Sequence, residues 1–228
     1  DAMALGGIRD HIGGGFHRYA TDENWFLPHF EKMLYDNAQL LSSYTQGAAA
    51  TDDPELRAVF LEVSDQLVSW IRREMTTSEG LFMSALDADT DHEEGLSYTW
   101  KYEDWMEVSS DSQLASRYGI EPEGNSYDEA TGESTGRNIP FLRERELRDP
   151  VLDELLSARL RWPQPGLDDK CLLSWNGLMI DALAEAGYIE EAERAAQGWI
   201  ALSGDLPHQV VKGVPSGSAF LDDYASFI

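Results

Sequence analysis

Two histidines near the start of the chain have the side-chain chemistry for proton transfer. His17 follows three glycines and precedes Arg18, and His29 follows Pro28. An imidazole titrates near neutral pH, so either histidine could take a proton from carbon or oxygen while the other returns one. We therefore interpret His17 and His29 as candidate catalytic residues. The alternative for His29 is a capping role in a helix that begins after Pro28.

Polar and aromatic side chains around these histidines could hold a substrate. Arg18 and Lys32 suit an anionic or polar ligand, and Trp25 and Tyr35 offer flat faces on which a sugar ring stacks. Glu31 precedes Lys32 directly, and the alternative for this pair is an ion pair on the surface. We interpret all five as candidate substrate-binding residues in one wall of a site.

An acidic segment follows an apolar run further along the chain. Asp87 and Asp89 come first in it and could form a carboxylate pair for acid–base work, so both are candidate catalytic residues. Asp87, Asp89 and Asp91 occupy alternate positions, which is the spacing of the first calcium ligands in an EF-hand loop. The segment fails the EF-hand pattern, because its sixth position is His92 and its twelfth is Tyr98. We assign no metal; a solvated acidic loop is the alternative.

Two further groups lie at expected helix starts and could bind substrate. Trp175 and Asn176 place an aromatic platform and an amide together, with packing of Trp175 in the core as the alternative. Asp222, Asp223 and Tyr224 place two acids and a phenol together. For the two acids, the alternative is a favourable interaction with the helix dipole.

Composition restricts the class of protein. Asp and Glu number 42 against 17 Lys and Arg, a formal net charge of −25, and such a surface repels nucleic acid. We interpret this charge as adaptation to a salty cytoplasm; an acidic mesophilic enzyme is the alternative. No apolar run is long enough to span a membrane. Cys171 stands alone, so no internal disulfide is expected, and no motif indicates a cofactor.

Apolar residues at steps of three and four predict helical hairpins. One stripe occupies 30–44 and a second 56–71, and between them Asp53 suits an N-cap, with Pro54 at the first helical position. The two stripes predict an αα-hairpin.

A second helical hairpin is expected over 174–186 and 189–200, with Gly187 between its helices. Two short extended runs, 81–86 and 96–100, predict a β-hairpin insertion around the acidic segment. We expect residues 1–228 to form a single all-α domain of stacked helical hairpins.

Five motifs carry a family resemblance in the order expected of that family. They are residues 6–19, 28–37, 84–89, 174–180 and 220–225. With them the chain resembles the helical-toroid region of the spermatogenesis-associated thioredoxin-domain family. The resemblance implies an (α/α)6 toroid like those of six-hairpin glycosidases and N-acylglucosamine 2-epimerases. It also implies that this chain lacks the thioredoxin-like domain of full-length relatives and some hairpins of the toroid.

Three functions fit these observations, and fold alone does not choose among them. The first is epimerisation or isomerisation of a reducing sugar, with His17 and His29 as base and acid. The second is glycoside hydrolysis by two carboxylates from Asp87, Asp89, Glu31 or Asp222. The third is a non-catalytic toroid that binds a glycan or protein, or supports the thioredoxin-like domain. An incomplete toroid would also expose apolar edges through which copies self-associate.

Overall fold

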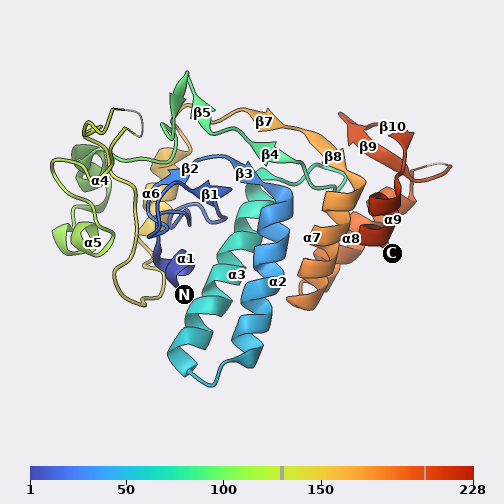
Figure 1. Ribbon diagram of the computed structural model, residues 1–228, viewed down its shortest axis with the longest axis horizontal. Helices are drawn as coiled ribbons and strands as arrows, with labels where there is room; N and C mark the ends of the chain where they lie inside the picture. The colour runs from blue at the N-terminus through green and yellow to red at the C-terminus, as the bar shows by residue number, and fades with distance from the viewer. Residues whose placement is uncertain (129–130, 203) are drawn as a thin grey trace.

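The computed structural model describes residues 1–128, 131–202 and 204–228, and its regular structure is mainly helical (Figure 1). The helices are α1 (Ala2–Leu5), α2 (Leu34–Ala50), α3 (Pro54–Glu74), α4 (Tyr102–Ser109), α5 (Ser112–Arg117), α6 (Leu152–Arg159), α7 (Leu173–Glu185), α8 (Ile189–Ile200) and α9 (Leu221–Phe227). None of the helices in this described part is both long and apolar enough to cross a membrane.

The strands are short and lie between or before the helices. They are β1 (Tyr19–Ala20), β2 (Pro28–His29), β3 (Lys32–Met33), β4 (Ala85–Leu86), β5 (Asp89–Thr90), β6 (Glu93–Glu94), β7 (Leu167–Asp168), β8 (Lys170–Leu172), β9 (Pro207–Val211) and β10 (Val214–Ser218).

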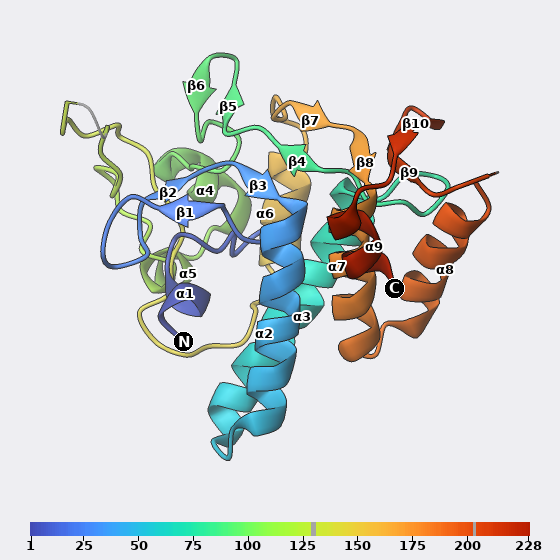
Figure 2. The same cartoon turned by 45° about the vertical axis from the view of Figure 1, so that its right-hand side comes forward.

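Both predicted helical hairpins are present. Helices α2 and α3 form the first, and the carboxylate of Asp53 caps α3 by accepting hydrogen bonds from the backbone N–H groups of Glu55 and Leu56. Helices α7 and α8 form the second, and Gly187 lies between them with a φ of 88°. Helix α7 packs against both α2 and α9, so the hairpins stand side by side (Figures 1 and 2).

The strands repeat one connection pattern. Strand β3 leads into α2, and the chain returns from α3 through β4, which pairs with β3. Strand β8 leads into α7, and the chain returns from α8 through β9, which pairs with β8. These strands run along the end of the hairpins where α2 and α7 begin (Figure 1). We call this end the mouth.

Two expectations about local structure were wrong. The helix expected to begin after Pro28 begins at Leu34 instead, because the preceding backbone pairs as β2 with β1 and as β3 with β4. The β-hairpin expected between 81–86 and 96–100 lies inside the acidic segment, where β5 pairs with β6. The end of the first run, β4, pairs with β3 and β7.

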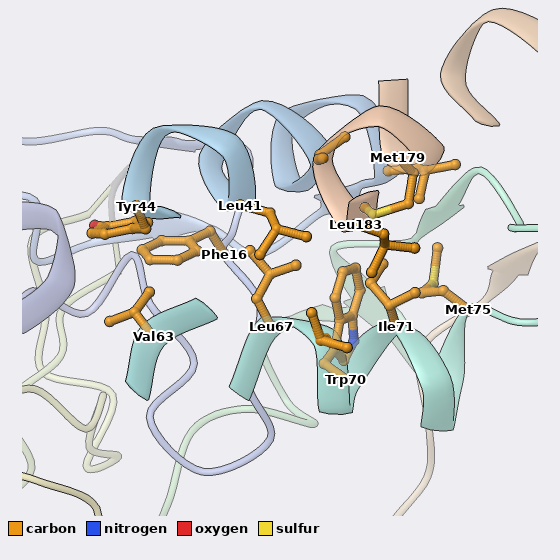
Figure 3. Packing of buried hydrophobic residues seen from close by; sticks show 14 of the residues in the cluster. Phe16, Leu41, Tyr44, Val63, Leu67, Trp70, Ile71, Met75, Met179 and Leu183 are labelled. Atoms are coloured by element: carbon orange, nitrogen blue, oxygen red, sulfur yellow. The ribbon is translucent and has the colours of Figure 1, made fainter. Parts of the chain in front are cut away.

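Two main apolar cores support these elements. The larger one fills the space between α2, α3 and α7, and Figure 3 shows Leu41, Leu67, Trp70 and Met179 meeting there. Phe16, from the glycine-rich segment, packs into the same core, with its ring stacked 5.4 Å from that of Tyr44. The second core joins α4, α5 and α6 around Trp100 and Trp105. Because Phe16 is anchored in the larger core, the polar residues that follow it are held near the mouth.

Candidate functional site

His29 forms a carboxylate–imidazole pair near the mouth. Its Nδ1 lies 2.7 Å from Oε1 of Glu94, which stands on β6, 65 residues away in the sequence. Its ring stacks on Tyr19, with centroids 4.9 Å apart, because Tyr19 and His29 are register partners in the β1–β2 pair. A carboxylate at Nδ1 fixes the proton on that nitrogen and leaves Nε2 to act on a ligand. The side chain is 29% exposed, so a ligand can reach it.

A cavity of about 550 Å³ lies beside this pair, and Glu94 forms part of its wall. The residues on either side of His29, Pro28 and Phe30, line it too. The lining combines carboxylates, hydroxyls, a guanidinium and aromatic rings: Leu27, Pro28, Phe30, Glu93, Glu94, Thr99, Ser126, Tyr127, Asp128, Thr135, Arg137 and Ile139. Such a mixture suits a ligand with several hydroxyl groups and an apolar face.

Four of the predicted binding residues gather in pairs at the mouth. Arg18 donates to Oε2 of Glu31 at 2.8 Å, and the rings of Tyr35 and Trp175 meet edge to face at 4.8 Å. Asp36 lies beside them; burial raises the pKa of its carboxyl group, and the charge of Arg18 opposes that shift only in part. We call Arg18, Glu31, Tyr35, Asp36 and Trp175 the mouth cluster. It joins the first turn of α2 to the first turn of α7.

His17 is buried and does not fit the predicted part in proton transfer with a substrate. It is 2% exposed, and its Nδ1 lies 2.8 Å from the carbonyl oxygen of Phe30, to which it donates. The rings of His17 and Tyr98 pack edge to face, with their centroids 4.8 Å apart. Burial, aided by the charge of Lys32, lowers the pKa of His17 to about 3. A neutral imidazole with a backbone partner in the interior has a structural role.

Lys32 is also buried, which does not fit substrate contact. Its Nζ lies 2.8 Å from Oδ2 of Asp10 and 2.8 Å from the carbonyl oxygen of Gly14. Arg159 on α6 binds both oxygens of the same carboxylate at 2.8 and 2.7 Å. Burial by itself raises the pKa of Asp10, but Arg159 and Lys32 outweigh it and hold the pKa well below its usual value. This buried ion cluster ties the glycine-rich segment to β3 and α6.

Asn176 is fully buried and clamps backbone instead of facing a ligand. Its Oδ1 accepts from the N–H of Phe82, and its Nδ2 donates to the carbonyl oxygens of Phe82 and Leu172. Asn37 makes the same three bonds one hairpin earlier, to both backbone groups of Phe16 and to the carbonyl oxygen of Met33. Each asparagine is the fourth residue of its helix. The repeated clamp fixes the segment that packs beside each helix start.

The remaining predicted residues are scattered. Asp87 and Asp89 are exposed beside the β5–β6 hairpin, and Trp25 is 38% exposed in the turn between β1 and β2. Asp222 and Tyr224 are exposed on α9. Of the candidate carboxylates, Asp87 and Asp89 lie close together, since Oδ1 of Asp87 accepts a hydrogen bond from the backbone N–H of Asp89 at 3.2 Å.

Asp223 is buried and serves α9 and its neighbours. It accepts hydrogen bonds from the backbone N–H groups of Ser174 and Phe220, and Nδ1 of His208 lies 2.7 Å from its Oδ2. Burial acts to raise the pKa of Asp223, but the bonds from Phe220, His208 and Ser174 lower it. Asp223 was predicted to bind substrate, but in the structure its carboxylate connects α7, α9 and β9 through these hydrogen bonds.

Comparison with known proteins supports the family resemblance. The chain is 34% identical to spermatogenesis-associated protein 20 of Rattus norvegicus over 228 residues, which cover 84% of this chain and 28% of that protein. This chain has homologues named spermatogenesis-associated protein 20. The resemblance predicted from the five motifs is confirmed. The chain spans less than a third of the length of that relative. No family model matches this chain.

Two solved structures are distantly similar to the chain. The crystal structure of D-mannose isomerase shows 14% identity and a TM-score of 0.31, and the match covers 89% of this chain and 50% of that one. Cellobiose 2-epimerase from Bacillus thermoamylovorans shows 16% identity and a TM-score of 0.30, covering 92% and 56%. TM-scores this low carry no argument about function.

Sequence reasoning missed the partner of His29 and the residues around the cavity. Glu93 and Glu94 belong to the acidic segment for which the sequence leaves a solvated loop as the alternative, and no motif singles out Arg137 or His208. The acidic segment indicates a polar loop, but it does not show that this loop meets His29. In the part of the chain that the structure describes, no group of His, Cys, Asp or Glu could hold a metal ion.

Proposed function

We propose that this chain is the sugar-binding part of a carbohydrate-active protein and that His29 transfers a proton on an opened reducing sugar. The observation that carries the proposal is the pairing of His29 with Glu94, a residue in the wall of the 550 Å³ cavity. The cavity is large enough for a small sugar, and its polar and aromatic lining supports that ligand class. We also propose that the helical hairpins are an arc of an (α/α)6 toroid.

In the proposed step, Nε2 of His29 removes the proton from C2 of the open-chain aldose. The electrons of the C–H bond form a C1–C2 double bond, and the carbonyl oxygen becomes an enediolate oxygen. Return of a proton to the opposite face of C2 gives the epimer. Return of a proton to C1, after the proton of the C2 hydroxyl has passed to the C1 oxygen, gives the ketose. The imidazolium formed in the first step is stabilised by the carboxylate of Glu94 at 2.7 Å. Glu94 is a positioning residue, because it acts through His29.

Hydrogen–deuterium exchange tests this proposal. The protein is incubated with glucose and with mannose in D2O, and deuterium at C2 is followed by NMR. We expect incorporation with the natural sequence, and a loss of at least about 100-fold for His29→Gln, the usual range for a general base. Glu94→Gln should lower the rate and change its dependence on pH, because the imidazole loses its carboxylate partner.

His208 provides a matched control. It also pairs with a carboxylate at 2.7 Å, is 29% exposed and has an aromatic ring 4.9 Å away, but its partner is Asp223 at the start of α9. His208→Gln should therefore leave exchange unchanged. Equal losses in both variants, or exchange that survives His29→Gln, would remove His29 from the mechanism.

A non-catalytic glycan-binding role is the second candidate, and the edge-to-face pair of Tyr35 and Trp175 favours it. Aromatic faces at the mouth could hold a sugar without chemistry. This role predicts saturable sugar binding with no deuterium at C2, and loss of binding in Trp175→Ala. Glycoside hydrolysis by two carboxylates stays a prediction; its neighbouring candidates, Asp87 and Asp89, are both exposed. Self-association and support of a thioredoxin-like domain stay predictions.

A further inference from the structure

The cavity beside His29 carries an excess of negative charge on its lining. Three carboxylates, from Glu93, Glu94 and Asp128, face one guanidinium, from Arg137, which gives a formal net charge of −2. Neutralisation of Glu94 by a protonated His29 would still leave the lining negative. A ligand that brings further negative charge into this cavity must overcome that repulsion.

Arg137 uses three of its five N–H donors in bonds within the protein. Its Nη2 donates to the carbonyl oxygens of Leu96 and Thr99 at 3.1 and 2.7 Å, and its Nε donates to Oγ1 of Thr99 at 2.6 Å. These bonds direct the guanidinium toward the turn after β6. A phosphate group that bound at Nε or Nη2 would have to displace these intramolecular acceptors, so on this side chain it is left with the N–H groups of Nη1.

We infer that this cavity selects sugars by charge: it rejects phosphorylated sugars and favours an amino sugar over its neutral counterpart. The inference rests on the proposed function, because it assigns the substrate class of the same site. Glu93 is the specificity-determining residue in it. Glu93 stands on β6 next to Glu94 and lines the cavity. Its negative charge acts to raise the pKa of Arg137, against the lowering by burial.

Simple electrostatics sets the expected size of the effect. Two negative charges on the lining and nearly two on a sugar phosphate, about 8 Å apart in water, weaken binding about thirtyfold without screening and about fourfold with the screening of physiological salt. Between these limits, a sugar phosphate should bind about tenfold more weakly than the neutral sugar. The interaction is linear in charge, so a protonated amino sugar should bind about threefold more tightly than the neutral one. For the same reason, Glu93→Gln should reduce the tenfold difference to about threefold.

The experiment is titration calorimetry at pH 7 with glucose, glucosamine and glucose 6-phosphate as probes. It uses the natural sequence, Glu93→Gln and the control Glu190→Gln. Glu190 is exposed on α8, so this control makes the same change in net charge away from the cavity. We expect affinity to fall in the order glucosamine, glucose, glucose 6-phosphate. The differences in affinity between the probes should shrink in Glu93→Gln and stay the same in Glu190→Gln.

The two proposals fail differently in this experiment. If glucose 6-phosphate binds as tightly as glucose, or if Glu190→Gln compresses the order as much as Glu93→Gln does, charge selection by the cavity is wrong while sugar binding stands. If none of the three probes binds, sugar binding and charge selection are both overturned. Repeating the titrations in 1 M KCl adds a further check, because screening should reduce the differences between the probes.

Discussion

Replacing Lys32 by Met decides between the two roles considered for this residue. The sequence places Lys32 among substrate-binding candidates, whereas the structure buries it completely against Asp10. Methionine keeps the length of the aliphatic stem and removes the charge. The variant therefore tests the ion cluster without opening a large cavity.

The expected loss of stability follows from the contacts. The variant loses the bond from Nζ to Asp10, the bond to Gly14, and the cation–π contacts with Trp70 and Tyr98 at 5.2 and 4.8 Å. Removing one partner of a buried ion pair costs about 3–5 kcal/mol. Because a second cation still pairs with the Asp10 carboxylate, we expect the lower end, about 3 kcal/mol.

Urea and thermal denaturation followed by circular dichroism measure this loss. For a chain of this length, about 3 kcal/mol corresponds to a fall in Tm of about 6–12 °C. Lys170→Met is the matched control, because Lys170 pairs with Asp168 at 2.7 Å, with both side chains about 40% exposed. An exposed pair contributes about 0–1 kcal/mol, so this control should melt within about 4 °C of the natural protein.

The refuting result is specific. If Lys32→Met unfolds at the same urea concentration as the natural protein, the contacts of Lys32 in the ion cluster do not stabilise the fold. If this equally stable variant also loses sugar binding, Lys32 is a ligand-binding residue. A stability loss of about 3 kcal/mol in Lys32→Met with a near-neutral Lys170→Met supports the structural role.

Three further predictions follow from burial and charge. Asn176→Ala leaves the backbone N–H and C=O of Phe82 without their partner, so urea denaturation should show a loss of about 2–4 kcal/mol; a loss below about 1 kcal/mol would contradict the clamp. His17 has a folded pKa of about 3, below the unfolded value, so the unfolded chain binds the extra proton and stability falls by about 1.4 kcal/mol per pH unit as pH drops from about 6.5 toward 3. His17→Gln should reduce the slope between pH 6 and pH 4 by about 1.4 kcal/mol per pH unit. The slope from His11 should remain, because burial lowers its pKa to about 3 as well. An unchanged slope would refute the buried neutral imidazole of His17. The net charge of −25 predicts that Tm rises between 0.1 M and 2 M KCl, and a flat salt series would refute halophilic adaptation.

Much of the helical architecture could be predicted because its signals are local. The apolar steps of three and four and the Asp53–Pro54 pair specify the first hairpin within a few residues, without reference to distant segments. The start of α2 could not be found this way. The segment 28–33 forms strands because it pairs with β1 and β4, and β4 lies more than fifty residues further along the chain.

The candidate site could be predicted by residue type but not by role. His17 and His29 have the same chemistry and similar neighbours in the sequence. One is buried against a backbone carbonyl, and the other is half-buried against Glu94, so only the second can meet a ligand. Glu31 and Lys32 are likewise adjacent, yet one reaches Arg18 near the surface and the other enters the interior.

The sequence by itself determined the family resemblance, the two helical hairpins and the charge of the surface, because motifs, periodicity and composition are properties of the chain alone. The tertiary structure decided which polar residues are buried and which a ligand could reach. That depends on burial and on partners from distant segments, such as Glu94 for His29 and Arg159 for Asp10. An imidazole that is partly exposed and paired with a carboxylate is able to carry a proton, whereas a buried one stays neutral, because the cost of holding a charge depends on its surroundings.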